Sequence, residues 1–244
     1  DHREPAAGEP HRPAERVAEL AAITGLNRSA ITHILNDLLR KGLVEEVKKG
    51  KSGVRGGRCP IHLQVKFDAA TLIAVELGLS RIAGAISDLK GAELHREEME
   101  IVRGQPLLDG LTSFLDRLKS LAPGGFEPAA VIGVGCPGVV DHHRGRLVVN
   151  MFHGWRDVDV VEALAARYGK PVFLENDANA AAMGELDPLE KSLGIRSLAY
   201  LFIRESTPGS PSPLGVGGAL ILNGQLWRGA NFCAGEVSQT INQV

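Results

Sequence analysis

The sequence Glu175-Asn176-Asp177-Ala178-Asn179-Ala180-Ala181-Ala182 follows directly after the apolar run Val172-Phe173-Leu174. A short apolar run is typical of a buried strand and an alanine-rich run is typical of a helix, so this stretch predicts a strand-to-helix junction. Asn offers a donor and an acceptor, and Asp accepts hydrogen bonds from hydroxyls, so the pair could hold two adjacent hydroxyls of a polyol. Asp177 could also take a proton from one of them. The alternative is that Asp177 only caps a helix over residues 178–185.

Apolar runs and amphipathic patterns alternate on both sides of this junction. The predicted strands cover residues 73–77, 82–87, 131–134, 172–174, 198–203 and 219–222, and the predicted helices cover residues 106–121, 161–168 and 178–185. This alternation predicts an α/β fold for most of the chain. The sequence Gly135-Cys136-Pro137-Gly138 follows a predicted strand without a helix, so its glycines most simply serve a turn.

The composition is that of an ordinary globular protein. The chain has 244 residues, of which 44% are hydrophobic and 23% are charged, enough for one large domain or two small ones. No apolar run approaches the roughly 20 residues of a membrane span, and residues 1–13 lack the apolar core of a signal peptide, so we expect a cytoplasmic protein without a membrane partner. The three cysteines, Cys59, Cys136 and Cys233, are widely spaced and form no CxxC motif, so we expect neither a disulfide framework nor a zinc knuckle.

The net charge of −2 is unevenly distributed along the chain. Residues 1–66 carry 12 Lys and Arg against 8 Asp and Glu, whereas the remainder carries 15 against 21. Six basic residues follow one another without an acidic residue between them: Lys48, Lys49, Lys51, Arg55, Arg58 and Lys66. Such a run attracts phosphate groups, although a solvated basic loop would have the same composition.

Residues 14–41 have the pattern of a helix-turn-helix. Residues 14–22 are helical in composition, Thr24-Gly25-Leu26 breaks the helix, and Asn27 can cap a second helix that ends near Lys41. In this second helix a set of apolar residues recurs at helical spacing on one face: Ile31, Ile34, Leu35, Leu38 and Leu39. The outer face then carries residue types that read bases in a DNA groove: Arg28, Ser29, Thr32, His33 and Asn36.

The following segment predicts a wing, because a strand over residues 42–47 and a strand over residues 61–65 flank a basic, glycine-rich loop. We expect the second helix, from its cap Asn27 onward, to contact bases. Phosphate contacts are expected from four residues of the wing: Lys48, Lys49, Lys51 and Arg58. A helical hairpin with a solvated polar face would explain Arg28 and His33, but not the uninterrupted positive wing. The sequence therefore predicts binding to double-stranded DNA.

Five motifs resemble those of ROK-family transcriptional regulators in order and spacing. Residues 20–29 with Gly56-Gly57-Arg58 resemble the winged-helix domain of that family. The later motifs are Glu76-Leu77-Gly78 with Ser87-Asp88-Leu89-Lys90-Gly91, then Gly133-Val134-Gly135-Cys136-Pro137-Gly138-Val139-Val140-Asp141, the stretch over residues 175–182, and Leu222-Asn223-Gly224-Gln225-Leu226-Trp227-Arg228-Gly229-Ala230-Asn231. The resemblance implies an irregular Pro-rich segment at 1–13, a winged helix-turn-helix domain at 14–66, and an actin-like (ribonuclease H-like) sugar-binding domain at 67–244.

The resemblance also implies sugar-binding residues. Asn176 and Asp177 match the family's hexose-binding pair, with Asp177 at the position of the kinases' catalytic base. Glu236 matches the Glu of a Glu-x-Gly-His motif whose His binds sugar and often zinc, and here Gln239 replaces that His. Because Gln is a poor zinc ligand and the family's downstream cysteine cluster is absent, we expect no metal. Asn150 matches a family cleft position, although a loop-capping role is equally consistent with it.

Two departures separate this chain from the kinases of the family. Where ROK kinases carry Asp-x-Gly-Gly-Thr-Lys around the ATP phosphates, this chain has Glu76-Leu77-Gly78-Leu79-Ser80-Arg81. A Leu79 side chain obstructs the close approach of the backbone to a phosphate, and Glu76 replaces the expected Asp. The second glycine motif, Gly215-Val216-Gly217-Gly218, is preceded by an insertion over residues 207–213. We therefore expect no catalytic residue, no enzyme activity and no cofactor.

These observations favour a sugar-responsive transcriptional regulator, in the simplest case a repressor of carbohydrate-utilisation genes. We expect it to bind operator DNA and a hexose or hexose derivative. ROK regulators normally continue well beyond this point, so the resemblance implies a truncated second lobe, and a homo-oligomer if the C-terminal part is present. Two alternatives are an ATP-dependent hexose kinase of the ROK family and a truncated, nonfunctional family member.

Overall fold

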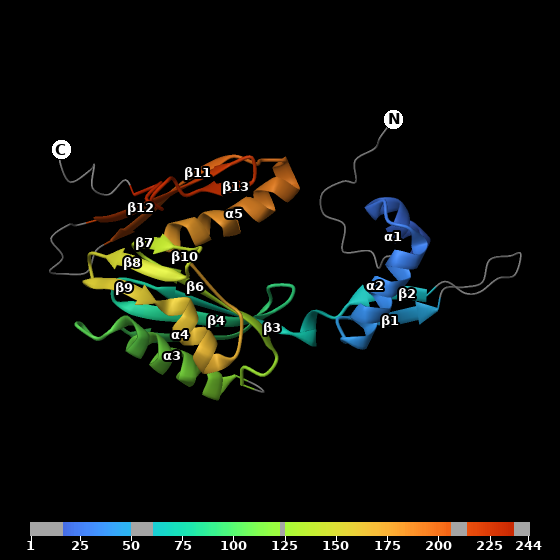
Figure 1. Cartoon of the computed structure of the whole chain (residues 1–244), viewed down its shortest axis with the longest axis horizontal. Helices are drawn as coiled ribbons and strands as arrows, with labels where there is room; N and C mark the ends of the chain where they lie inside the picture. The colour runs from blue at the N-terminus through green and yellow to red at the C-terminus, as the bar shows by residue number, and fades with distance from the viewer. Residues whose placement is uncertain (1–16, 50–60, 123–124, 206–213, 237–244) are drawn as a thin grey trace, which may run out of the picture. The chain divides into compact units, whose positions relative to one another are not determined.

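The computed structural model of the chain describes residues 17–49, 61–122, 125–205 and 214–236 (Figure 1). The chain divides into two compact units. The first comprises Asp1–Ala70 with Asp88–Lys90, and the second comprises Thr71–Ser87 with Gly91–Val244. Within the described ranges, no helix is both long enough and apolar enough to cross a membrane.

The first unit begins with two helices joined by a tight turn, α1 (Val17–Thr24) and α2 (Arg28–Arg40). Gly25 in the turn has a φ of +71°, a left-handed conformation that suits glycine. Asn27 caps α2, because its side-chain oxygen accepts a hydrogen bond from the N–H of Ala30 at 2.8 Å. The predicted helix-turn-helix is confirmed, with α1 ending at Thr24 rather than at residue 22.

The apolar face of α2 packs as predicted with one exception. Ile31 is buried and Leu35, Leu38 and Leu39 are half-buried, whereas Ile34 is 47% exposed. At about 3.6 residues per turn, Ile34 lies on the edge of the stripe that Ile31 and Leu38 define. Its assignment to the core was wrong.

A two-stranded antiparallel sheet completes this unit. β1 (Val44–Lys49) pairs with β2 (Ile61–Val65), with an irregularity between Glu46 and Lys48. A short 3₁₀ helix, Phe67–Ala69, follows β2. The predicted arrangement of two strands around a loop is confirmed. Lys51 and Arg58 of the predicted wing lie outside the described residues, as do the side chains of Lys48 and Lys49.

The second unit is built on a five-stranded sheet with the order β10-β6-β3-β4-β5. Its strands are β3 (Thr71–Leu77), β4 (Arg81–Asp88), β5 (Glu93–Glu100), β6 (Ala129–Cys136) and β10 (Val172–Asn176). β10, β6 and β3 are parallel to one another, and β4 pairs with β5 antiparallel. All four strands predicted for this region are present. β5 was not predicted, because it forms the sheet edge and consists mainly of charged residues.

Two helices, α3 (Leu107–Leu121) and α4 (Val160–Tyr168), lie on the same side of this sheet (Figure 1). Their apolar faces join the main hydrophobic core, in which Phe114 and Leu164 are fully buried. The Phe114 ring lies so close to Gly84 of β4 that a Cβ atom at that position would be 2.6 Å from the ring. Gly84 is therefore required by packing and not by its backbone conformation.

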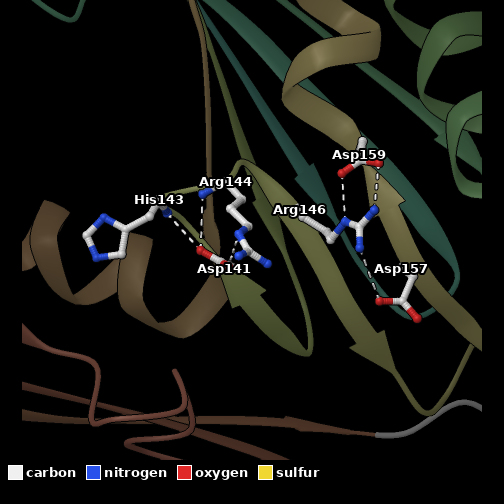
Figure 2. A network of polar contacts seen from close by, with 6 residues as sticks. All are labelled: Asp141, His143, Arg144, Arg146, Asp157 and Asp159. Carbon is white, nitrogen blue, oxygen red and sulfur yellow. Dashed lines mark hydrogen bonds and ion pairs between the residues drawn. The ribbon is translucent and has the colours of Figure 1, made fainter.

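A small antiparallel sheet of three short strands was not predicted. It consists of β7 (Val139–Asp141), β8 (Arg146–Asn150) and β9 (Trp155–Asp159). Arg146 on β8 donates two hydrogen bonds to the carboxylate of Asp159 on β9, at 2.6 and 2.8 Å, and lies 3.6 Å from Asp157 (Figure 2). Each of these strands has only three to five residues, and none has more than three consecutive apolar residues, so the sequence gives only a weak signal for them.

The last part of the unit is a helix packed on a second three-stranded sheet. The helix is α5 (Asp177–Leu193), and the strands are β11 (Leu198–Glu205), β12 (Leu214–Leu222) and β13 (Gln225–Trp227), in that order. Leu186 packs with Ala219 and Ile221 in a separate apolar cluster. α5 continues past the predicted end at residue 185, through Pro188, and stops at Gly194, whose φ is +67°.

Candidate functional site

The sequence motifs of the second unit meet at the carboxyl ends of three parallel strands. In the sheet register, Gly135 of β6 lies opposite both Glu175 of β10 and Glu76 of β3, and Asn176 lies opposite Cys136. The carboxyl edge of a parallel sheet is the usual place for a ligand site in α/β folds. The fold therefore brings the predicted Asn176–Asp177 pair and the Gly135–Gly138 turn together at one edge.

Asn176 holds this edge together. It is the N-cap of α5, since its Oδ1 accepts a hydrogen bond from the N–H of Asn179 at 3.1 Å. Its Nδ2 donates to the carbonyl of Gly138 at 3.0 Å, so the same side chain fixes the turn after β6. One amide hydrogen of Asn176 is left for other contacts.

Asp177 is the first residue of α5 and not its cap, so the alternative that it serves as the N-cap was wrong. Its Oδ1 accepts a hydrogen bond from the N–H of Ala178 at 2.9 Å. A negative charge in the first turn is stabilised by the helix dipole. The carboxylate is half-buried, at the position where the sequence analysis predicted hydroxyl binding.

Glu175 and Arg228 form an ion pair beside this position that the sequence analysis missed. Nε and Nη2 of Arg228 donate to Oε2 of Glu175 at 2.9 and 2.6 Å. Oε1 of Glu175 accepts from the N–H of Asn176 and from Nδ2 of Asn179, both at 3.0 Å. The only sequence signal for this network was a carboxylate at the end of an otherwise apolar strand.

Glu236 lies near Asp177, because the preceding Gly235 lies against Gly218 of β12 and the adjacent Gly217 lies against Ala178 of α5. Desolvation raises the pKa of Glu236, although the residue is exposed overall, and the negative charge of Asp177 raises it further. Two neighbouring carboxylates can accept hydrogen bonds from the hydroxyls of one ligand. Gln239, the fourth predicted sugar ligand, lies outside the described residues.

Asn150 is almost fully buried, at 2% exposed, and both ends of its amide bind backbone. Nδ2 donates to the carbonyl of Pro137, and Oδ1 accepts from the N–H of His153, both at 2.8 Å. These contacts give Asn150 the loop-capping role that the sequence analysis left open. Its role in sugar binding stays a prediction.

The turn between β3 and β4, where the kinases would hold phosphate, is closed by protein contacts. The N–H of Gly78 donates to the carbonyl of Arg81 at 2.7 Å. The carbonyl of Gly78 lies 3.2 Å from Nε2 of His153, whose ring stacks on Trp155 with the centroids 4.0 Å apart. Leu79 is half-buried in the same turn. The insertion over residues 207–213 lies outside the described residues. Its effect on the second glycine motif therefore stays a prediction.

The cysteines and the metal-ligand types give no further site in the described part of the chain. Cys136 is buried, and burial together with the nearby Asp177 charge raises the pKa of its thiol far above the ordinary value. Cys233 is exposed. No group of three or more His, Cys, Asp or Glu residues among those described is arranged to hold a metal ion.

In the first unit, the predicted base-reading side chains all lie exposed on α2: Arg28, Ser29, Thr32, His33 and Asn36. The hydroxyl of Thr32 donates to the carbonyl of Arg28 at 2.8 Å, so its methyl group is the free contact surface. Asn27 is exposed at the start of the helix, where its side chain is occupied by capping. The polar face predicted from the sequence is therefore present.

Comparisons with known proteins agree with this architecture. The family model described as "ROK family" matches residues 72–241, and the one described as "IclR helix-turn-helix domain" matches residues 9–48. A xylose repressor from Bacillus spizizenii is 30% identical over 228 residues, which is 90% of this chain and 54% of the relative.

Two solved structures show the same fold. A ROK-family transcriptional regulator, a homologue of the E. coli Mlc protein, matches with a TM-score of 0.69 at 20% identity, over 88% of this chain and 52% of the other. A ROK hexokinase from Thermus thermophilus matches with a TM-score of 0.53 at 27% identity, over 68% of this chain and 52% of the other. This chain thus spans about half the length of the relatives that it matches. Because the ROK match covers most of the chain and the second unit has the corresponding fold, the chain belongs to the ROK family.

Proposed function

We propose that this chain contains the DNA-binding and sugar-sensing parts of a sugar-responsive transcriptional repressor that acts on carbohydrate-utilisation genes. The observation that carries the proposal is the presence of both parts in one chain. A winged helix-turn-helix unit exposes a row of groove-reading side chains on α2, and a ROK unit places Asn176 and Asp177 at the carboxyl edge of its sheet. The helix-turn-helix match and the repressor among the relatives support the same function.

The proposed DNA contacts divide into two kinds. α2 would enter the major groove, where Arg pairs with guanine and Asn with adenine, so Arg28 and Asn36 are the proposed base readers, with Ser29, Thr32 and His33 beside them. Asn27 starts the helix, whose N-terminal N–H groups favour a backbone phosphate. The basic residues of the wing, Lys48, Lys49, Lys51 and Arg58, would hold phosphates without reading the sequence.

The proposed effector is a hexose or a hexose derivative. Asp177 and Glu236 would accept hydrogen bonds from its hydroxyls, and Asn176 would donate with its remaining amide hydrogen. Gln239 and Asn150 are proposed as further contacts of the sugar. Asn150 would act through the loop that it fixes by its hydrogen bonds to Pro137 and His153. Sugar binding would change DNA affinity by favouring one of two conformations of the protein.

We also propose that the chain has no enzyme activity and uses no cofactor or metal. A kinase needs a loop whose backbone N–H groups face a phosphate, whereas here the Gly78 N–H is bonded to Arg81 and the Gly78 carbonyl faces His153. The competing function is an ATP-dependent hexose kinase, which the fold shared with a ROK hexokinase favours. A truncated member of the family without a function of its own is the third candidate.

A repressor acts on chromosomal DNA, so a cytoplasmic location is part of the proposal. A homo-oligomer is also part of it, because symmetric operators are read by symmetric proteins whose two recognition helices are one DNA turn apart.

The test is fluorescence anisotropy of labelled duplexes that cover the DNA upstream of the protein's own gene, with and without hexoses, N-acetylhexosamines and pentoses. We expect specific binding to one duplex and a change in its affinity with one sugar class. ATP-dependent phosphorylation of a hexose above the level of an Asp177→Asn variant would instead support the kinase. Binding to all duplexes alike, without any sugar effect, would contradict the proposal.

A further inference from the structure

Asn179, which donates to Glu175 of the Glu175–Arg228 ion pair, and His142 each have one buried polar atom that lacks a hydrogen-bond partner. Among the described residues, three buried side-chain nitrogen or oxygen atoms have no hydrogen-bond partner: His95 Nε2, His142 Nδ1 and Asn179 Oδ1. Asn179 is only 4% exposed and donates its Nδ2 to Glu175. An unpaired buried polar atom destabilises a protein, because it has lost its hydrogen bonds to water without replacing them. Two such atoms around one ion pair indicate that a polar group binds there.

This cluster is connected to the proposed sugar-binding pair by shared hydrogen bonds. Glu175 accepts from the N–H of Asn176, and Asn179 donates its N–H to the Asn176 side chain. The carbonyl of Gly138 accepts a hydrogen bond from the Asn176 amide. Gly138 directly precedes β7, and His142 directly follows it. The unpaired atoms therefore belong to segments that meet at Asn176.

A third segment closes the cluster. Phe232, on the stretch that leads to Glu236, packs edge-on against the His142 ring with the centroids 5.5 Å apart, and His143 contacts both rings. These rings offer an apolar surface beside the polar atoms. A surface that is apolar on one side and carries a few fixed polar groups is typical of small-molecule sites.

The charges of the residues around this cluster indicate which ligands it can bind. The charges of Glu175 and Arg228 compensate each other, and Asn179 is uncharged. Desolvation lowers the pKa of His142, and the positive charges of Arg228 and then His143 lower it further. These effects outweigh the carboxylates of Glu175 and Asp141, which raise the pKa. The His142 ring is therefore neutral near pH 7. Asp177 adds a negative charge to these surroundings, where burial and then this charge raise the pKa of Glu236.

We propose that Asn179 Oδ1 and His142 Nδ1 bind hydroxyl groups of the effector, and that the effector is an uncharged sugar and not a sugar phosphate or a sugar acid. This inference rests on the proposed function, because it places the sugar at Asn176 and Asp177. Asn179 Oδ1 can only accept, so its partner supplies an O–H group, whereas neutral His142 donates or accepts according to its tautomer. A phosphate or carboxylate would meet the Asp177 carboxylate and no unpaired cation among the residues named for this site.

Isothermal titration calorimetry of the chain tests this with D-glucose, D-xylose and N-acetyl-D-glucosamine, each compared with a phosphate ester that keeps its pyranose ring (the 6-phosphates of the two hexoses and the 1-phosphate of xylose). His142→Phe keeps a ring against Phe232 and removes Nδ1, and Asn179→Leu removes the acceptor at similar volume. His95→Phe is the matched control, because it removes the third buried atom without a hydrogen-bond partner, on β5, at the opposite edge of the sheet from β10. We expect at least one uncharged sugar to bind, its phosphate ester to bind at least about tenfold more weakly, and each of the first two variants to lose about tenfold or more in affinity, with His95→Phe within about twofold of wild type.

Thermal unfolding of the same variants keeps the test decisive. A higher Tm for His142→Phe with unchanged sugar affinity would show that Nδ1 is only a packing defect or a water site. This result alone would overturn the inference, so the test remains valid even if Asn179→Leu does not fold. Tighter binding of a phosphate ester than of its sugar would overturn the ligand class. If Asp177→Ala abolishes sugar binding while His142→Phe and Asn179→Leu leave it unchanged, the proposed function stands and this inference fails. No saturable binding of any sugar to wild type would overturn both the inference and the sugar-sensing half of the proposed function, whereas DNA binding decides the other half separately.

Discussion

Arg228 donates two hydrogen bonds to a single carboxylate oxygen of Glu175, from Nε at 2.9 Å and from Nη2 at 2.6 Å. Glu175 belongs to β10 of the five-stranded sheet, and Arg228 directly follows β13 of the second sheet. The pair therefore joins the five-stranded sheet to the β11-β12-β13 sheet next to Asn176 and Asp177. Both side chains are largely buried, at 28% exposed for Arg228 and 20% for Glu175.

Arg228→Met should lower the free energy of unfolding by about 1–3 kcal/mol, because it leaves the Glu175 carboxylate half-buried without its cation. Lys191→Met is the matched control, since the Lys191–Asp187 pair on α5 is 73% and 66% exposed and contributes less than about 0.5 kcal/mol. Urea denaturation measures both. Equal losses in the two variants would mean that the Arg228 pair is no stronger than a surface pair.

Gly84→Ala should destabilise the second unit by about 1–3 kcal/mol, because the added Cβ would lie 2.6 Å from the Phe114 ring in a fully packed core. Gly184→Ala is the control, since this glycine lies in α5 with no atom within 4 Å of an added Cβ, and alanine there should stabilise the helix by about 0.5–1 kcal/mol. Urea denaturation should shift in opposite directions. If Gly84→Ala is neutral, Phe114 has room to move and the core is looser than the structure indicates.

His153 should make the protein less stable in mild acid. Desolvation lowers the pKa of His153, and its hydrogen bond to the Gly78 carbonyl offsets only part of this. The unfolded chain therefore binds the proton first, so stability is complete above about pH 6.5 and is lost as the pH falls through the folded pKa. His153→Gln should show a smaller loss of stability between about pH 7.5 and about pH 5.5 than wild type does. His33→Gln, on the exposed face of α2, is the control, and the same pH dependence in all three proteins would contradict the assignment.

The parts of the fold that the sequence could predict are those with a strong local pattern. β3, β6 and β10 are parallel strands that carry apolar residues on both faces, so each is a short apolar run, although β10 forms one edge of the sheet. β5 lies at the edge of the sheet and is rich in Glu, and the strands of the small sheet are held by pairs such as Arg146–Asp159. Such pairs depend on which segments meet in space and leave no local signal.

The candidate site shows the same limit. The predicted strand-to-helix junction placed Asn176 and Asp177 correctly between a strand and a helix, because the change of periodicity occurs there, whereas only the structure shows that this strand end lies at the carboxyl edge of a parallel sheet. Which of the two caps α5 could not be decided from residue preferences, since Asn and Asp are about equally good caps. The Arg228–Glu175 pair was missed because 53 residues separate its members in the sequence.

Arg28→Ala and Lys48→Ala should weaken DNA binding in different ways. Arg28 lies on the exposed face of α2, so its loss should relax sequence preference at about 1–3 kcal/mol for the preferred operator. Lys48 belongs to the basic wing, so its loss should weaken all DNA alike and reduce the salt slope by about one unit. Anisotropy titrations with operator and scrambled duplexes over a range of salt concentrations separate the two effects. An equal loss of specificity in both variants would contradict the division into base reader and phosphate contact.

Asp177→Ala should lower sugar affinity about tenfold or more while leaving DNA affinity unchanged, because the two sites lie in different units of the chain. The sugar should then no longer alter DNA binding, since coupling between sites requires a ligand that distinguishes the two conformations. Calorimetry and anisotropy on the same preparation measure both effects.

Asp177 is also the first residue of α5, where its charge stabilises the helix by about 0.3–1 kcal/mol, so the alanine variant alone cannot separate binding from folding. Asp177→Asn keeps the shape and removes the charge, and Asp187→Ala removes an exposed carboxylate from the same helix. We expect Asp177→Asn to reduce sugar affinity and Asp187→Ala to leave it unchanged. Saturable sugar binding that is the same in all of these variants would leave Asp177 with no role beyond its place at the start of the helix.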